Sequence, residues 1–300
     1  MTHSIVTNEA TARRAPVATL RTRRVVWKRL IGGAAQVGLL LFFLVIALAP
    51  VVLMWMSAFK TPQEISRAPL APPTSLSPDN LIQAWTVGRF GEYVGNSIIV
   101  TIPVVLGVVM LSAMAGYGFA RHRFWGRQVV FYAFLIGLMV PFQSIMIPLY
   151  FNIKNLGLLG TYWAMILPAI ALGLPFGIFL MQSFFRGLPH ELADSARVDG
   201  CNEFQVFWRV LLPLAKPAIS SLVVFQFMWT WNAYLMPLLL MNQESLRPIT
   251  LGLMFFQGRY TTNYALIAAG VTIVTFPIIL VYIVMQRQFL RGLTAGALRG

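Results

Sequence analysis

Six long stretches without a charged residue constrain this 300-residue chain more than any other feature of its sequence. Each exceeds about 20 residues, the length at which a helix crosses a hydrocarbon core about 30 Å thick. Lipid offers no partners to exposed backbone groups, so such stretches are expected to be helices. The predicted spans cover approximately residues 31–56, 94–118, 128–150, 161–185, 217–241 and 263–286.

The composition agrees with a chain whose main solvent is lipid. Hydrophobic residues make up 58% and charged residues only 11% of the sequence, against roughly 45–50% and 25% in soluble domains. We therefore predict an all-α integral membrane protein with six transmembrane helices and a cytoplasmic two-helix loop between spans four and five. A basic, mostly disordered tail (1–29) precedes the transmembrane domain (30–290), which includes the loop 186–216, and a C-terminal tail (291–300) follows.

The distribution of Lys and Arg predicts the orientation of the spans. The segments on one side carry seven, three, four and three basic residues, whereas those on the other carry three, one and two. Cytoplasmic loops carry the excess of positive charge, so this multi-pass membrane protein is expected to have both termini in the cytoplasm. This topology accounts for the net charge of +14 and leaves no reason to expect nucleic-acid binding.

Several kinds of chemistry are missing from the spans. None of the six stretches contains Asp, Glu, Lys or Arg, and the three histidines, His3, His122 and His190, lie outside them. The sequence has no Gly-rich phosphate loop, so the chain is expected to bind no ATP, metal or other cofactor and to have no catalytic residues. The single cysteine, Cys201, permits no internal disulfide. Any energy source must lie in another chain.

The loop 186–216 holds an unusual concentration of acidic residues. Four of the nine in the chain fall within thirteen positions, namely Glu191, Asp194, Asp199 and Glu203. Leu192, Ser195, Ala196 and Asp199 recur at helical spacing, and Gly200 interrupts the pattern. Small Ser195 and Ala196 would permit close approach by a partner.

A second short helix is expected after the glycine. Asn202 is a plausible N-cap with Gln205 three positions later. The predicted apolar face of this helix consists of Phe204, Phe207, Trp208 and Leu211. Pro213 and Pro217 should end the helix before the fifth span. The alternative is a surface loop that lies on the bilayer with Phe207 and Trp208 in the headgroups.

The stretch 189–217 resembles the cytoplasmic signature of bacterial ABC importer permeases, E-A-A-x(3)-G-x(9)-I-x-L-P. Asp194, Ser195 and Ala196 take its first three places and Gly200 its glycine, with the last pair matched by Leu212 and Pro213. Val210 stands for the isoleucine. The resemblance extends to Asn96-Ser97, Trp231-Asn232 and the tail 291–300, which look like the smaller permease of maltose-type carbohydrate importers.

This resemblance implies a role and a set of partners. The signature would form a coupling helix in a cleft of an ATPase subunit, with Glu191, Asp194 and Asp199 as polar groups, Ser195 and Ala196 for close approach, and Gly200 as the turn. The implied partners are a second permease subunit in a heterodimer, two ATPase subunits that bind ATP and Mg, an extracytoplasmic solute-binding protein, the lipid bilayer and a sugar. The tail 292–300 would reach between the ATPases; the alternative is a frayed terminus.

The fifth predicted span carries an unusual density of aromatic and amide groups. Sugars expose apolar C–H faces and hydroxyls, and aromatic rings with amides can satisfy both. We therefore take as candidates for the substrate path Gln226, Trp229, Trp231, Asn232 and Tyr234. Packing, or a place in the outer aromatic belt, is the alternative for Trp231 and Tyr234.

Three other functions are alternatives to the import of a sugar. The same machinery could import a non-sugar solute such as a polyol or glycerol phosphate. A polytopic membrane enzyme would need His, Asp or Glu within the spans, and these are absent. A scaffold would have no reason to carry the twenty-residue signature.

Overall fold

Helices make up the regular secondary structure, as expected where backbone groups have no water to bind. The computed structural model describes the backbone of residues 19–258 and 262–297, and the side chains of residues 36–258 and 262–286. Within these ranges the only strand-like pairing is an isolated bridge between Gln257 and Thr262. The predicted all-α class is confirmed.

The chain divides into two units, Met1–Leu53 and Met54–Gly300, which we describe separately. The first contains most of helix α1, Thr19–Ser57. This helix begins inside the segment predicted as a disordered tail. Residues 19–29 contain neither Gly nor Pro, so extending the helix through them costs little. Residues 1–18 lie outside the described residues. The described apolar side chains of this unit are almost all exposed, which suits a helix in hydrocarbon.

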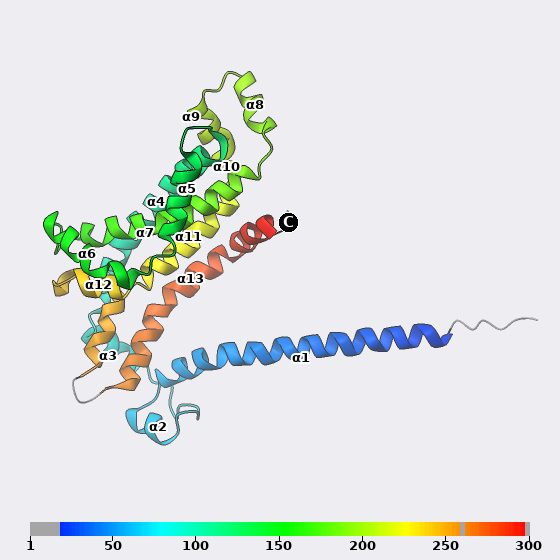
Figure 1. Cartoon of the computed structure of the whole chain (residues 1–300). Coiled ribbons are helices and arrows are strands. Elements are labelled where there is room, and N and C mark those ends of the chain that lie inside the picture. Colours follow the sequence, from blue (N-terminus) through cyan, green and yellow to red (C-terminus); the bar gives the residue numbers. More distant parts are fainter. Residues whose placement is uncertain (1–18, 259–261, 298–300) are drawn as a thin grey trace, which may run out of the picture. The chain divides into compact units, whose positions relative to one another are not determined.

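The second unit contains the remaining helices (Figure 1). They are α2 (Pro62–Arg67), α3 (Asp79–Val87), α4 (Phe90–Arg121), α5 (Arg127–Gly137), α6 (Phe142–Asn155), α7 (Trp163–Arg186), α8 (Glu191–Val198), α9 (Glu203–Gln205), the π-helical turn η1 (Val206–Leu211), α10 (Leu212–Leu214), α11 (Lys216–Trp231), α12 (Leu235–Leu240), the 3₁₀ turns η2 (Glu244–Leu246) and η3 (Ile249–Phe256), and α13 (Tyr264–Ala297).

Four helical segments among the described residues are long and apolar enough to cross a membrane. They are Gln36–Ser57, Phe90–Arg121, Trp163–Arg186 and Tyr264–Gln286. Two further spans result if α5 with α6, and the stretch Glu203–Leu214 with α11, are each one bent span. Helix α13 continues to Ala297, into the segment predicted as a tail, and residues 298–300 lie outside the described residues.

The third predicted span is not one continuous helix. Helices α5 and α6 meet at an angle of 101° across the break before Phe142. Pro141 has no N–H to donate to the carbonyl of Gly137, four residues earlier, and α5 ends at that glycine. Proline therefore divides this span into two arms.

The fifth predicted span, 217–241, is also broken. Helix α11 ends at Trp231, and α12 begins only at Leu235. Pro237 cannot donate to the carbonyl of Ala233, and the hydroxyl of Thr250 donates to that carbonyl instead, at 2.7 Å. The break is thus satisfied by a contact from the segment that follows it.

The centre of the second unit is the close packing of α4 against α7. Glycines make this approach possible: a Cβ at Gly116 would lie 2.7 Å from the Cβ of Met181 and 2.8 Å from the backbone nitrogen of Gln182. At Gly177 a Cβ would meet the side chain of Ser112. One apolar core follows this helix pair into α8 and η1, and another joins α3, α4, η3 and α13.

The two ends of the helix bundle carry different polar structures. At one end, Asn96 of α4 donates to the carbonyls of Ser245 (2.8 Å) and Arg247 (2.9 Å) and accepts from the hydroxyl of Tyr162 (2.7 Å). Ser97 accepts from the backbone N–H of Ile249. The pair Asn96-Ser97 therefore fixes the segment between α12 and α13. Helices α8 and α9 lie at the other end (Figure 1).

Candidate functional site

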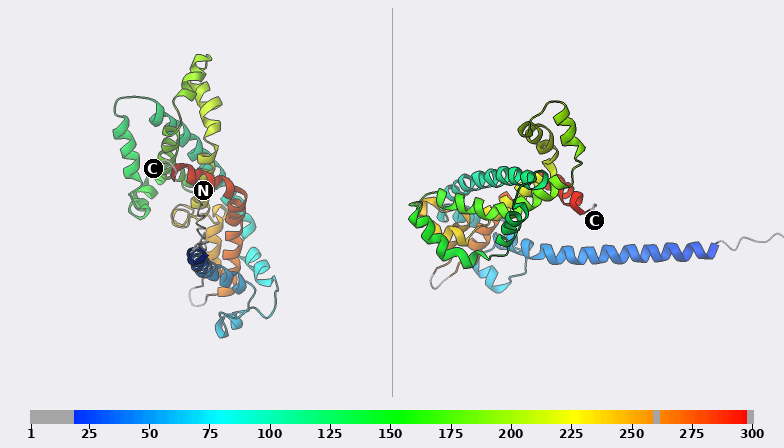
Figure 2. Two further views of the ribbon diagram at one scale, coloured as in Figure 1. Left: turned by 90° about the vertical axis from the view of Figure 1, so that its right-hand side faces the viewer. Right: turned by 45° about the horizontal axis from the view of Figure 1, so that its top comes forward.

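The predicted coupling segment, 186–216, projects from one end of the second unit (Figure 2). It contains helix α8 and a second helical stretch, Glu203–Leu214, as expected from the spacing of its apolar residues. The second stretch makes an angle of 75° with α11 at Ala215. The segment is thus a folded element between two spans.

Gly200 ends α8 in the way that its position predicts. Its φ is +85°, in the left-handed region that glycine favours. The N–H of Cys201 donates to the carbonyl of Ala196 at 2.9 Å, and the N–H of Gly200 donates to the carbonyl of Arg197 at 3.0 Å. These two bonds form a Schellman motif, which satisfies carbonyls at the helix end and fixes the direction of the chain beyond it.

The second stretch starts with the predicted capping box. The Asn202 side chain accepts from the N–H of Gln205, and the Gln205 side chain accepts from the N–H of Asn202, both at 2.9 Å. The helix then widens into the π turn η1, where the N–H of Leu212 donates to Phe207, five residues back. It includes Pro213 and stops at Leu214, between the two prolines that were expected to end it before the fifth span.

The aromatic face of this stretch packs against the chain itself. Phe207 is buried, with its ring centroid 5.2 Å from that of Tyr117 in α4 and 6.3 Å from that of Phe185 in α7. Phe204, predicted on the same face, is 67% exposed, because the wide π turn changes the angular offset of the residues before it. The alternative that placed Phe207 in lipid headgroups is wrong.

A network of charged groups joins α8 to the second stretch and to α4. Arg197 donates to Asp194 at 2.6 Å and, through Nε and Nη2, to both carboxylate oxygens of Glu203 at 2.7 and 3.3 Å. The same carboxylate accepts from the hydroxyl of Tyr117 at 2.9 Å and lies 3.8 Å from His122. The hydrogen bonds from Arg197 lower the pKa of Glu203 below its ordinary value.

A second connection ties α4 to the start of the segment. The guanidinium of Arg121 donates to the carbonyl of Leu188 at 2.7 Å and lies 2.8 Å from Nδ1 of His190. Together with Glu203, Arg121 holds both sides of α8 to the end of α4.

The predicted coupling residues divide into an outer and an inner group. Exposed residues are Glu191, Asp194, Ser195, Asp199, Gly200 and Pro213, and Leu212 is half-buried. Ala196, expected to face a partner, is 7% exposed and packs in the core beneath α8. Its small size brings α8 close to the chain's own second helix.

The segment also presents a residue that the sequence reasoning missed. Val198 is 88% exposed near the C-terminal end of α8, beside Asp194 and Ser195 on its outer surface. An exposed valine between polar neighbours carries no signal in a periodicity pattern. Only its position in the folded segment distinguishes it.

Two of the predicted path residues line one cavity. A cavity of about 120 Å³ lies between α4, α7 and α11 and is lined by Val100, Met165, Ala169, Leu172, Gly173, Gln226, Trp229, Thr230, Ala233 and Met236. Gln226 is buried and donates to the hydroxyl of Thr230 at 3.1 Å. Its Oε1 atom has no hydrogen-bond partner among the described residues. This oxygen is buried and faces Gly173, so it is an unsatisfied acceptor in the wall of the cavity.

The two tryptophans of α11 have different surroundings. The Trp229 ring is 51% exposed and stands edge to face with that of Phe176 at 5.2 Å. Trp231 is 3% exposed, stacks on Phe227 at 5.3 Å and donates to the carbonyl of Val274 at 3.1 Å. Trp231 therefore packs α11 against α13 and does not line the cavity. The packing alternative is correct for this residue.

The last two predicted path residues lie at the break after α11. Asn232 is exposed, and its side chain donates to the carbonyl of Met228 at 2.9 Å. Tyr234 is 40% exposed at the start of α12. Neither lines the cavity with Gln226 and Trp229. The structure thus brings together two of the five residues and separates the other three.

Comparison with known proteins identifies the family of this chain. Residues 108–294 match the family described as the inner membrane component of binding-protein-dependent transport systems. The chain is 38% identical over 269 residues to the probable ABC transporter permease protein YurM of Bacillus subtilis, with 89% of each chain covered.

Two further relatives are named by what they transport. One is the diacetylchitobiose uptake system permease protein NgcG of Streptomyces coelicolor, 34% identical, with 87% of each chain covered. The other is the arabinooligosaccharides transport system permease protein AraQ of Halalkalibacterium halodurans, 34% identical, with 86% of this chain and 94% of the relative covered.

The fold is also shared with a solved structure. A chain in the crystal structure of a bacterial ABC transporter involved in the import of the acidic polysaccharide alginate matches with a TM-score of 0.76 and 22% identity. The match covers 92% of this chain and 100% of that one. The family match and these relatives show that the chain belongs to the inner membrane components of binding-protein-dependent ABC transport systems: it is a multi-pass, non-catalytic permease subunit.

Proposed function

We propose that this permease forms half of the translocation pathway of an ABC importer for a carbohydrate, with segment 186–216 as its contact with an ATPase subunit. Membership of the family implies an ATPase and a solute-binding protein as partners. The arrangement we propose comprises this chain, a second permease subunit, two ATPase subunits that bind ATP and Mg, and an extracytoplasmic binding protein.

One observation carries the coupling role. Helix α8 is closed by a Schellman motif and held by Arg197, Glu203 and Arg121, yet its outer side stays exposed at Asp194, Ser195 and Val198. A rigid helix that leaves both polar and apolar groups unburied has the composition of a small docking surface. Its attachment to α4 gives it a path by which to move the spans.

The coupling role predicts a loss of binding to the ATPase when the outer surface is altered. Val198→Asp places a charge on the exposed side of α8 without disturbing a buried contact, since this side chain is 88% exposed. We expect normal amounts in the membrane and reduced co-purification of the ATPase. Leu70→Asp is the matched control, because Leu70 is 73% exposed outside the segment. Full retention of the ATPase by Val198→Asp would contradict the docking assignment.

A carbohydrate is the substrate class that two lines of support favour. The relatives that act on diacetylchitobiose and arabinooligosaccharides are each 34% identical to this chain. The cavity beside α11 combines the unpartnered Gln226 oxygen with the exposed face of Trp229. An amide oxygen can accept from a sugar hydroxyl, and an aromatic ring can cover its C–H face.

The substrate class is tested by uptake in cells that lack the importer. Cells that regain the complete system should accumulate a labelled di- or oligosaccharide, and unlabelled glycerol phosphate or a polyol should not compete. Trp229→Ala should lower this uptake more than Tyr234→Ala, because Tyr234 lies outside the cavity. If glycerol phosphate or a polyol competed and an unlabelled saccharide did not, the non-sugar alternative would be supported.

A further inference from the structure

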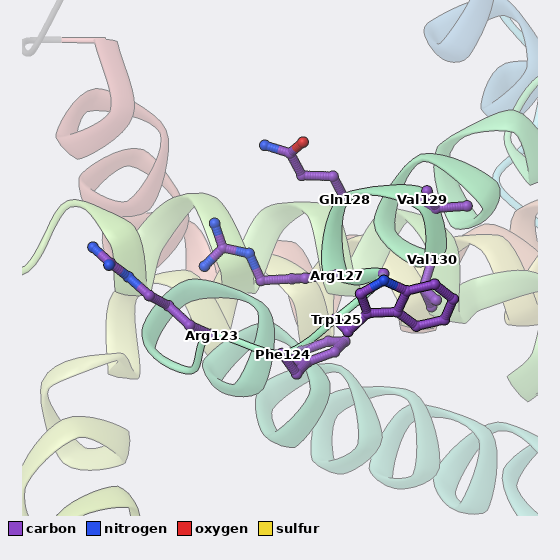
Figure 3. A pocket seen from close by; sticks show the side chains of 8 residues that line it. Arg123, Phe124, Trp125, Arg127, Gln128, Val129 and Val130 are labelled. Carbon is purple, nitrogen blue, oxygen red and sulfur yellow. The ribbon is translucent and has the colours of Figure 1, made fainter.

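A loop with basic and aromatic side chains joins α4 to α5. Residues 123–130 line a shallow groove of about 710 Å³ (Figure 3). Trp125 is fully exposed and Phe124 is 47% exposed. In the view of Figure 3 the guanidinium groups of Arg123 and Arg127 extend to one side of the loop, and the two rings lie on the other.

A second, smaller hollow continues from this groove. It has a volume of about 160 Å³ and shares Arg127 and Gln128 with the groove. Its opposite wall is formed by Gln182 and Arg186 of α7. Two arginines and two glutamines from α5 and α7 therefore line one hollow together with Phe119 and Phe131.

The arginines of this region are not neutralised within the described part of the chain. Neither Arg123 nor Arg186 has a carboxylate within 4 Å there. Arg127 donates one hydrogen bond to the carbonyl of His122, at 3.2 Å. The carboxylate of Glu203 is already bound to Arg197 and Tyr117. The hollow thus presents positive charge and hydrogen-bond donors that match an anion.

The position of the region indicates where such an anion would come from. The groove and the hollow lie where α4 ends and α5 begins and beside the end of α7, all of which are membrane spans or parts of one. Exposed tryptophan is typical of the membrane interface, and arginine binds phosphate oxygens through paired donors. Apolar Phe124 and Trp125 could not remain in water without cost.

We propose that this region binds the headgroup of an anionic phospholipid, with the phosphate between Arg127 and Arg186 and the rings of Phe124 and Trp125 beside the acyl chains. The proposal requires only that the spans lie in a bilayer. It does not depend on the substrate or on the docking of the ATPase. The ligand comes from the membrane and not from free phosphate, because the exposed rings adjoin the basic hollow.

The test compares lipids on the full chain purified in detergent. Native mass spectrometry counts bound phosphatidylglycerol and bound phosphatidylcholine of identical acyl chains. We expect the wild type to prefer phosphatidylglycerol, and we expect Arg127→Gln/Arg186→Gln to weaken its binding by roughly tenfold or more, since each interfacial cation contributes. Arg67→Gln/Lys154→Gln removes the same charge outside the region and should keep the preference.

Each other outcome would overturn the proposal. Equal binding of the two lipids by the wild type would show that charge is not recognised, and an equal loss in the control would show that only net charge matters. Displacement of the lipid by inorganic phosphate would identify a free anion as the ligand. Arg186→Gln alone should also weaken binding. This variant is expected to fold, because Arg186 is exposed and outside the core, so its weaker binding would not be explained by misfolding.

Discussion

At the residue scale, Gly200 is the position where backbone conformation matters most to the coupling segment. A Cβ there would meet nothing within 4 Å, so the cost of a substitution comes from its φ of +85° alone. Gly200→Val should disfavour the Schellman turn by roughly 1–2 kcal/mol and reduce retention of the ATPase on co-purification. Gly200→Asn should retain most of the binding, since asparagine tolerates the left-handed region. Equal retention by the Val and Asn variants would contradict this account.

Glu203 connects three parts of the segment through charge. Its pKa is lowered from the ordinary 4.5 by the hydrogen bonds from Arg197. A carboxylate with a lowered pKa contributes stability above the unfolded value and loses it as the pH falls through the folded one. The network should therefore persist from about pH 5 to 8, and retention of the ATPase should not vary over that range.

Removal of the Glu203 charge tests the same network. Because Arg197 and Glu203 are both partly exposed, Glu203→Gln should cost about 1 kcal/mol or less in overall stability. Hydrogen exchange of the α8 amides should nevertheless increase, since the helix loses its bidentate partner. Arg209→Gln is the control, because among the described residues Arg209 has no carboxylate within 4 Å. Unchanged exchange in Glu203→Gln would show that the ion pairs do not hold α8.

Residue roles in the path could be predicted only in part from the sequence. Trp229 and Trp231 are two positions apart on a helix, so they point to nearly opposite sides. The amino-acid pattern does not say which side meets α13, and the tertiary contact with Val274 decides it. By contrast, Gly200, Asn202 and Gln205 were predictable, because turns and caps depend on neighbouring residues alone.

At the scale of elements, the six apolar stretches could be predicted, but the breaks within the third and fifth spans could not. Helix α7 contains Pro168 and Pro175 and stays one helix, whereas Pro237 accompanies a break. The difference lies in distant partners: the carbonyl of Ala233 is satisfied by Thr250, seventeen residues later in sequence. A proline in the sequence shows only that one backbone N–H is absent. Contacts from the rest of the fold decide whether the helix breaks there.

The α4–α7 contact permits a matched pair of glycine substitutions. Gly116→Ala brings a Cβ within 2.8 Å of the Gln182 backbone, which cannot move without separating the helices. We expect a loss of about 1–3 kcal/mol, measured by thermal unfolding of the full chain in detergent. Gly118→Ala, in the same helix with nothing within 4 Å, should be neutral or slightly stabilising. Similar melting of both variants would contradict the close packing.

At the scale of the whole molecule, the orientation of the spans remains a prediction from basic residues. Asn96 lies near the N-terminal end of α4, whereas Arg121 at the C-terminal end of α4 contacts the segment that leads into α8. Figure 1 shows α3 and α8 at opposite ends of the second unit. The positive-inside rule assigns the α8 end to the cytoplasm, because the alternation of six predicted spans would put 17 of the 23 Lys and Arg residues in the segments of that side. The proposed docking of an ATPase requires the same orientation.

Single cysteines in a Cys201→Ser background test this orientation with an impermeant maleimide. Ser75→Cys and Gln243→Cys should react in intact cells, because both positions are exposed in segments that precede α3 and follow α12. Ser195→Cys, exposed on α8 of the chain alone, should react only in inverted membrane vesicles made from cells that lack the ATPase subunits, which would otherwise cover it. Reaction of Ser195→Cys in intact cells would place the segment outside the cell, where no ATP is available to a partner, and both the orientation and the coupling role would then be wrong.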